Sequence, residues 1–187
     1  MKYNVGMELT HSMQAFILHW GEMGSRWGVN RTVAQVHALL YLSPEALTAD
    51  EIVETLSVAR SNVSTSLREL QSWKLVEAVP SLGDRRDRFR TSHDVWELFV
   101  TVMEQRVERE IVPTLNLLRR CCAEALRESD TPPEVAAQIV AMAGFLEETH
   151  GWYEKIKTLS PATLRSLMRF GTGITRVLPA KGARKTS

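Results

Sequence analysis

The spacing of apolar residues predicts a chain that is almost entirely helical. Between residues 8 and 27, apolar side chains recur every three or four positions, which is the period of a helix with one buried face. Asn30 is placed to cap a second helix, and Ser43-Pro44 is placed to end it. Thr48 and Glu51 form a T-x-x-E capping box, which predicts that a third helix begins directly after Thr48.

A fourth helix follows with one apolar face and one polar face. Val63, Leu67 and Leu70 lie at positions i, i+4 and i+7, so the apolar face is expected to be buried. Short polar groups and arginines, which can approach base edges without steric bulk, make up the other face: Arg60, Ser61, Asn62, Ser64, Thr65 and Arg68.

Two strands are predicted next, at residues 75–79 and 88–91, with a loop of sequence PSLGDRRD between them. Gly83 supplies the positive φ that a hairpin turn tends to need, and Asp84 can bind its own backbone. Arg85 and Arg86 are therefore expected at the tip of a hairpin.

The second half of the chain is again helical. A helix is predicted from residue 95 up to an interruption at Pro113, a second from 115 to 126, a third from Pro133, and a last one from Ser160-Pro161. The predicted fold is mainly α with a small β-hairpin wing. The expected domains are an N-terminal dimerisation helix, a winged helix-turn-helix domain, a helical linker and dimerisation region, and a disordered basic tail: residues 1–29, 30–92, 93–177 and 178–187.

Charge is balanced over the whole chain, with 23 Lys and Arg against 22 Asp and Glu in 187 residues. Its distribution is uneven, because Leu56 to Ser92 contains seven basic residues and four acidic ones. Four of the seven basic residues lie in the predicted hairpin, where they would neutralise nucleic-acid phosphates. The alternative is a solvated run of charges without a partner.

Location and redox state follow from what the sequence lacks. No apolar run approaches the ~20 residues that a membrane-spanning helix requires, so no membrane partner is expected. The N-terminus has no cleavable apolar core, which argues against secretion. Cys121 and Cys122 are adjacent and make a poor structural disulfide. We therefore expect a cytoplasmic protein.

Catalysis and cofactors are not predicted. The sequence has no phosphate-binding loop, no G-x-S-x-G elbow and no H-E-x-x-H zinc motif. His11 and His19 are eight residues apart in the first helix, and no Cys-x-Cys or close His pair indicates a metal site.

Several motifs together indicate a family. The segment SVARSNVSTSLRELQSWKLV resembles the recognition helix and following turn of MarR-type winged-helix regulators. GDRRDRF, DVWELF and REIVPTL resemble the GbsR branch of that superfamily. The resemblance covers roughly residues 10–175 and implies a homodimeric transcription factor that binds double-stranded DNA.

The resemblance also implies which residues bind DNA: Arg60, Ser61, Asn62, Ser64, Thr65 and Arg68 in the helix, and Asp84, Arg85, Arg86 and Arg88 in the wing. The arginines of the wing, with Arg90, would contact phosphates, and Asp84 would anchor arginine geometry. Two positions depart from the family pattern. Ala59 stands where a capping Ser or Thr is frequent, so Ser57 or a shifted start is expected to cap the helix. Lys74 replaces a frequent Gly at the end of the helix.

Aromatic residues provide a candidate effector site. Some relatives in the GbsR branch sense osmolyte-related compounds, and aromatic rings can enclose a quaternary ammonium such as choline or betaine through cation–π attraction. The predicted contacts are Phe16, Trp20, Trp27, Trp96, Phe99 and Trp152. The alternative is that these rings are ordinary core.

Two other functions remain open from the sequence. A winged helix can act as a protein–protein adaptor without DNA, in which case partner binding would be insensitive to salt. A thiol-based redox sensor would use Cys121 or Cys122.

Overall fold

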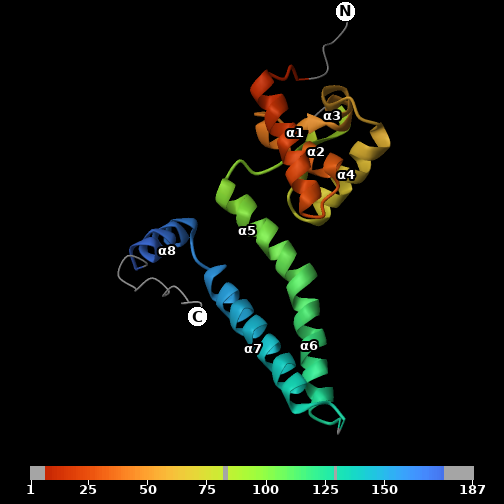
Figure 1. Ribbon diagram of the computed structural model, residues 1–187. Coiled ribbons are helices and arrows are strands. Elements are labelled where there is room, and N and C mark those ends of the chain that lie inside the picture. The colour runs from red at the N-terminus through yellow and green to blue at the C-terminus, as the bar shows by residue number, and fades with distance from the viewer. Residues whose placement is uncertain (1–6, 82–83, 129, 175–187) are drawn as a thin grey trace, which may run out of the picture. The chain divides into compact units, whose positions relative to one another are not determined.

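The computed structural model describes residues 7–81, 84–128 and 130–174, with the backbone alone at 81, 84, 85 and 171–174. The predicted basic tail and Gly83 lie outside the described residues. The chain forms two compact units, Met1–Gln105 and Arg106–Ser187 (Figure 1).

The first unit contains five helices and three strands within its described residues: α1 (His11–Arg26), α2 (Arg31–Leu42), β1 (Leu47–Thr48), α3 (Ala49–Leu56), α4 (Arg60–Ser72), β2 (Glu77–Ser81), β3 (Asp84–Arg90) and α5 (Val95–Arg106). The predicted caps explain where two helices begin. The Asn30 side chain accepts a hydrogen bond from the Thr32 N–H at 2.8 Å. Thr48 and Glu51 form the expected reciprocal capping box at the start of α3. The predicted first four helices are thus confirmed.

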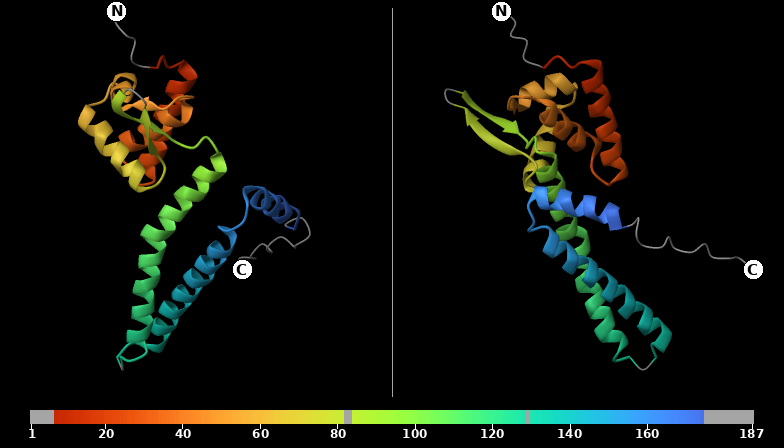
Figure 2. Two further views of the ribbon diagram at one scale, coloured as in Figure 1. Left: turned by 180° about the vertical axis from the view of Figure 1, so that it is seen from behind. Right: turned by 90° about the vertical axis from the view of Figure 1, so that its left-hand side faces the viewer.

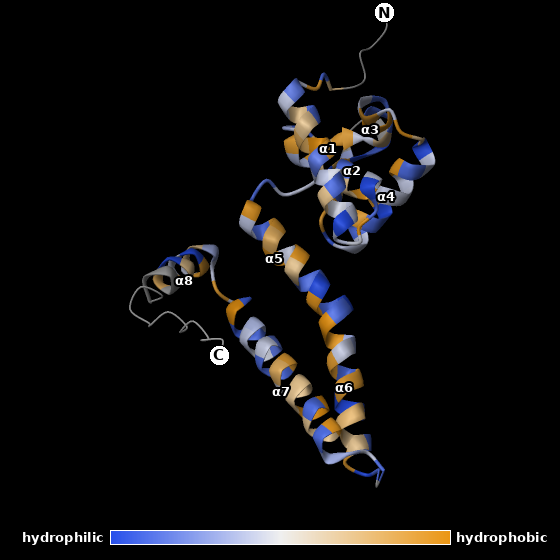
Figure 3. Cartoon of the chain, in the orientation of Figure 1, coloured by the Kyte–Doolittle hydropathy of each residue, from blue (hydrophilic) through white to orange (hydrophobic). Residues whose placement is uncertain are grey.

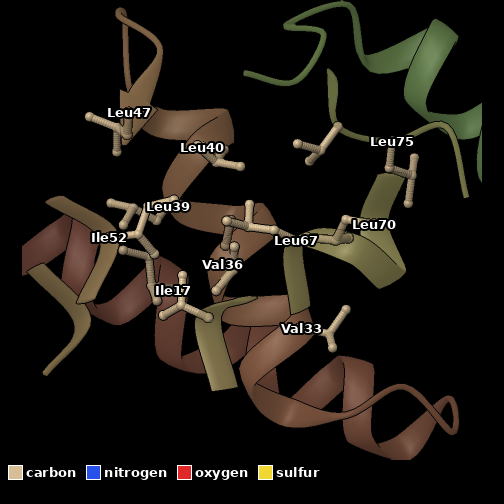
Figure 4. Packing of buried hydrophobic residues seen from close by; sticks show 13 residues of the cluster. Ile17, Val33, Val36, Leu39, Leu40, Leu47, Ile52, Leu67, Leu70 and Leu75 are labelled. Atoms are coloured by element: carbon tan, nitrogen blue, oxygen red, sulfur yellow. The ribbon is translucent and has the colours of Figure 1, made fainter. Parts of the chain in front are cut away.

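The core of this unit is built from the apolar faces of α1 to α4 (Figure 4). Val36, Leu39 and Leu40 of α2 are completely or almost completely buried, so α2 is the central helix. Gly24 of α1 allows a close crossing, because a Cβ atom there would lie 2.6 Å from the Cβ of Ala34 in α2.

One buried polar contact joins α2 to the sheet. The Thr91 hydroxyl donates to the Leu75 carbonyl at 2.7 Å, so its oxygen accepts from Nε2 of His37, 3.3 Å away. Burial lowers the pKa of His37 to about 4, because a charged imidazolium would lose its hydration there. His37 is therefore a neutral core residue at neutral pH.

The three strands form an antiparallel sheet in the order β1-β3-β2. Leu47 pairs with Phe89, and Glu77 pairs with Arg90, so β3 is the central strand. The β2–β3 ribbon extends beyond the helices of its unit (Figure 2). A register irregularity lies between Val79 and Ser81, at Pro80.

The wing differs from its prediction in two ways. The predicted loop PSLGDRRD is largely strand, since β2 continues to Ser81 and β3 already begins at Asp84. The two arginines expected at the tip, Arg85 and Arg86, therefore belong to β3. Cross-strand pairing outweighs the loop propensity of these polar residues, and an edge strand tolerates Pro80. The two-residue strand β1 was not predicted.

The ends of α4 also correct the sequence interpretation. Ser57 does not cap α4: it has a left-handed conformation (φ 52°) and ends α3, and no side chain caps α4 at Ala59. Lys74 adopts the left-handed conformation usual for Gly (φ 57°). The Leu75 N–H then bonds the Leu70 carbonyl at 2.9 Å, which closes the helix in the manner of a Schellman motif.

The second unit is described by a π-helical turn and three helices: η1 (Val107–Ile111), α6 (Val112–Ala125), α7 (Pro133–Ile156) and α8 (Pro161–Ile174). Pro113 explains the π-helical turn, since it has no N–H for the carbonyl four residues earlier. The Val112 N–H instead bonds the Val107 carbonyl, and the Thr114 hydroxyl donates to the Glu110 carbonyl at 2.6 Å. The predicted interruption at Pro113 is confirmed.

Apolar residues of the second unit are mostly not buried. Apolar and polar positions alternate along α6 and α7 (Figure 3). Among the described residues of this unit, only Val107, Leu115, Ala125 and Ala143 are buried. Ten large apolar side chains are instead 41–75% exposed: Leu117, Leu126, Val135, Val140, Met142, Phe145, Trp152, Leu167, Met168 and Phe170.

Candidate nucleic-acid interface

Helix α4 presents its polar face to solvent. Val63, Leu67 and Leu70 are buried in the core of the first unit. The six predicted DNA-binding residues of this helix are all exposed: Arg60, Ser61, Asn62, Ser64, Thr65 and Arg68. The 3.6-residue period of the helix brings these side chains to one surface, as a DNA-reading helix requires.

Both arginines on this face, Arg60 and Arg68, contact neighbouring side chains. The Arg60 guanidinium forms an ion pair with the carboxylate of Asp50, in the first turn of α3. Nη2 of Arg68 lies 3.4 Å from the Thr65 hydroxyl, one helical turn away. Asp50 thus sets the position of Arg60, although the sequence interpretation missed it. The only sequence signal was an acidic residue in the first turn of a helix.

The wing carries arginines that differ in their surroundings. Arg86 is exposed. Nε of Arg90 donates to Glu77 Oε1 at 2.5 Å, across the β2–β3 pair, and both side chains are more than half exposed. The side chains of Asp84 and Arg85 lie outside the described part of the chain, although both belong to β3.

Arg88 connects the wing to the helix-turn-helix. Its Nη1 donates to the Ala46 carbonyl at 2.8 Å and lies 3.7 Å from Glu51 Oε2, and its side chain is 33% exposed. That Glu51 oxygen also accepts from the Thr48 N–H at 2.6 Å. The capping box of α3 and the central strand of the wing therefore share one polar cluster.

The sequence of this region identifies the family. Residues 27–87, which include α2 to α4 and most of the wing, match the MarR family. The winged helix-turn-helix segment of the chain is thus similar to the MarR family. It is distantly similar to the HTH-type transcriptional repressor GbsR of Bacillus subtilis (strain 168), with 23% identity over 137 residues, which cover 72% of this chain and 76% of the relative. The HTH-type transcriptional repressor OpcR of the same organism is 20% identical over 154 residues, which cover 81% and 83% of the two chains.

A solved structure supports the fold. The crystal structure of a transcriptional regulator superposes with a TM-score of 0.63 at 19% identity, covering 78% of this chain and 95% of that chain. The predicted fold, helices with a small β wing, is confirmed. The MarR-family match of residues 27–87 and the similarity to HTH-type repressors identify a DNA-binding transcriptional regulator rather than an enzyme.

Among the described residues of the first unit, four of the aromatic residues predicted as an effector site form two ring pairs. Phe16 and Trp20 stack with their ring centroids 5.4 Å apart, which leaves no room for a quaternary ammonium between them. Trp96 and Phe99 form a separate edge-to-face pair, with centroids 6.2 Å apart. Trp27 of the first unit and Trp152 of the second are 58% and 61% exposed.

Other candidate chemistry is limited in the described part of the chain. Cys121 and Cys122 are both free and both half-buried. Within residues 7–81, 84–128 and 130–174, no three His, Cys, Asp or Glu side chains are grouped so as to hold a metal ion. The same described ranges contain no helix with the length and apolar character needed to span a bilayer.

Proposed function

We propose that this regulator binds a pseudo-palindromic operator as a homodimer, and that a small-molecule effector alters this binding. The exposed polar face of α4 is the observation that supports this DNA-binding geometry. The opposite face of α4 is buried in the core of the first unit, which also contains the wing with its arginines. The names of GbsR and OpcR, both HTH-type transcriptional repressors, support this reading.

In this proposal, α4 lies in the major groove and reads bases. Ser61, Asn62, Thr65 and Arg68 discriminate between sequences, because their side chains are exposed on the groove-facing side. The Asn amide matches the donor and acceptor pattern of adenine, and the Arg guanidinium matches that of guanine. Each well-formed contact of this kind is worth about 1–3 kcal/mol of discrimination.

Phosphate contacts come from three features. Arg86 and Arg90 supply positive charge on the wing. The guanidinium of Arg88 has five N–H donors, so its bond to Ala46 leaves donors for a phosphate. The start of α4 has no side-chain cap, and its first N–H groups suit an anionic oxygen. These contacts give affinity and little sequence preference.

The second unit supports the homodimer. Its exposed apolar side chains include Phe145 and Trp152, which are 64% and 61% exposed. Monomeric proteins rarely expose so many large apolar groups, and burying them between two copies would stabilise a dimer. A two-fold dimer would carry two α4 helices, matched to half-sites about one DNA turn, roughly 34 Å, apart.

Regulation by a small-molecule effector is the third part of the proposal. It is supported by the resemblance to the GbsR branch. Among the aromatic residues predicted as contacts, Trp27, Phe99 and Trp152 are 58%, 54% and 61% exposed, so their rings are accessible to a ligand.

DNA binding is tested by selecting bound duplexes from a random pool and titrating the selected and scrambled duplexes by fluorescence anisotropy at several salt concentrations. Asn62→Ala is expected to weaken the selected duplex alone, by roughly tenfold. Arg86→Ala is expected to weaken both duplexes and to reduce the salt dependence. Equal affinities of wild type and both variants would remove α4 and the wing from the interface.

The homodimer is tested by light scattering after size exclusion. Phe145→Glu places a charge on an exposed apolar position of α7 and is expected to give monomers. Gln138→Glu adds the same charge at an exposed polar position of the same helix and is expected to leave dimers intact. A wild-type protein that is monomeric at micromolar concentration would contradict the proposal.

A further inference from the structure

A cavity of about 660 Å³ lies at the base of the wing, entirely within the first unit. This volume lies within the range of small-molecule sites. Four segments form its wall. Two of them are residues 43–46, before β1, and residues 74–79, from the end of α4 into β2. The other two are residues 90–93, between β3 and α5, and the first turns of α5 at Glu97, Leu98 and Thr101. None of the six aromatic residues predicted as effector contacts lines it.

Most polar groups of this wall bond one another. Arg90 pairs with Glu77 at 2.5 Å, and the Ser92 hydroxyl donates to Glu97 at 2.5 Å. Nε2 of His93 donates to the Ser43 carbonyl at 3.0 Å and so ties the segment before α5 to the end of α2. These contacts hold the four segments together around the cavity.

Two oppositely charged side chains of the wall do not take part in these contacts. Among the residues that the structure describes, neither the Lys74 ammonium nor the Glu45 carboxylate has a hydrogen-bond or ion-pair partner. A ligand with negative charge alone would meet the carboxylates of Glu45, Glu77 and Glu97. A ligand with positive charge alone would leave Lys74 without a partner. A ligand with both charges satisfies both groups.

The backbone at Lys74 gives an independent reason to assign a role to its side chain. Lys74 has a left-handed conformation (φ 57°) at a helix end where Gly would be unstrained. This conformation costs free energy in a residue with a Cβ atom, and the Lys74 side chain lines the cavity.

We propose that this cavity binds a small zwitterionic molecule, whose carboxylate pairs with Lys74 and whose cationic group pairs with Glu45. The site touches the end of α4, the base of the wing and the start of α5 at once. An occupant therefore favours one arrangement of the reading helix relative to the wing. This regulatory consequence rests on the proposed function, whereas ligand binding itself does not.

Binding is measured on the full chain without DNA, by calorimetric titration with a series of ω-amino acids from glycine to 6-aminohexanoate. Butyrate and butylammonium are the singly charged controls. We expect one chain length to bind best and both controls to bind at least about tenfold more weakly, since each loses one charge-assisted contact. No measurable binding by any member of the series would overturn the proposal.

Two variants locate the site. Lys74→Gly and Glu45→Gln are each expected to weaken the best zwitterion by about tenfold or more. Lys74→Gly also relieves the left-handed strain, so its melting temperature should not fall, and a loss of binding cannot be assigned to unfolding. Lys155→Ala removes an exposed lysine of α7 and should leave ligand affinity unchanged. Unchanged affinity in Lys74→Gly would overturn the assignment.

DNA titrations with and without the best zwitterion then separate the two proposals. Ligand binding without DNA binding would contradict the proposed function and leave the cavity assignment intact. DNA binding without ligand binding would contradict the cavity assignment alone.

Discussion

Nη1 of Arg88 donates a hydrogen bond to the backbone carbonyl of Ala46, at 2.8 Å. Arg88 belongs to the central strand of the sheet, and Ala46 directly precedes the strand that leads into α3. The bond therefore fixes the wing to the start of the helix-turn-helix, so Arg88 has a structural role beside any contact with DNA.

Arg88→Ala is expected to lower the free energy of unfolding by about 1 kcal/mol, since the Ala46 carbonyl loses a charged donor that is only partly exposed. Arg90→Ala removes the same charge two residues further along the strand, where the ion pair with Glu77 is exposed. It should change unfolding by no more than about 0.5 kcal/mol. Urea denaturation measures both, and equal stabilities of the two variants would show that the Ala46 contact contributes nothing.

Asp50→Asn is expected to reduce discrimination between selected and scrambled duplexes by about threefold to tenfold, because Arg60, a predicted DNA-binding residue beside the base-reading side chains of α4, loses the carboxylate that positions it. Affinity for the scrambled duplex should rise slightly, since a negative charge near the DNA is removed. Glu54→Gln removes an exposed carboxylate from the same helix and is the control. If both variants discriminate as well as wild type, Asp50 has no positioning role.

Stability should fall as the pH is lowered from about 6.5 to about 4. Because the folded-state pKa of His37 is lowered from 6.5 to about 4, the unfolded chain binds a proton in this window and the folded chain does not. One proton changes stability by about 1.4 kcal/mol per pH unit, so the loss attributable to His37 is about 3 kcal/mol. Urea denaturation between pH 7.5 and 4 gives the slope.

His37→Gln should flatten this pH dependence, whatever its effect on stability at pH 7. Equal slopes in wild type and His37→Gln would contradict the assignment of this acid sensitivity to His37.

Gly24→Ala is expected to destabilise the first unit by about 1–2 kcal/mol. Its Cβ would lie 2.6 Å from the Cβ of Ala34, a short side chain that cannot move aside, and this overlap outweighs the gain of about 1 kcal/mol in helix propensity. At Gly21 the nearest atom is Cγ of Gln35 at 2.7 Å, in a flexible side chain. Gly21→Ala should therefore be neutral or slightly stabilising.

A double-mutant cycle with Ala34→Gly tests this explanation by thermal denaturation. If the clash is real, Ala34→Gly is less destabilising in the Gly24→Ala background than in wild type. Additive effects would locate the cost of Gly24→Ala elsewhere.

Much of the fold could be predicted from the sequence, because the signals were local. The caps at Asn30 and Thr48 and the prolines at 133 and 161 mark helix ends through contacts within one turn. The first strand was predicted two residues too early and the second was predicted too short, since pairing of Ser81 with Asp84 is a cross-strand contact that local propensity assigned to a loop.

The candidate site was predicted less completely, for a related reason. The exposed face of α4 follows from helical period alone. The partners of Arg60 and Arg88 depend on how distant segments meet: Ala46 is 42 residues from Arg88 in the chain. The glutamate of the capping box was recognised, but nothing in the T-x-x-E motif indicates that it also lies beside the wing.

Pro80 has a consequence for solubility. It lies in β2, which forms an outer edge of the three-stranded sheet and could in principle recruit a strand from another molecule. Proline offers no amide hydrogen to such a strand, and the irregularity beside it spoils the flat geometry that fibril-like stacking needs. The ribbon can thus protrude into water without becoming a seed for aggregation.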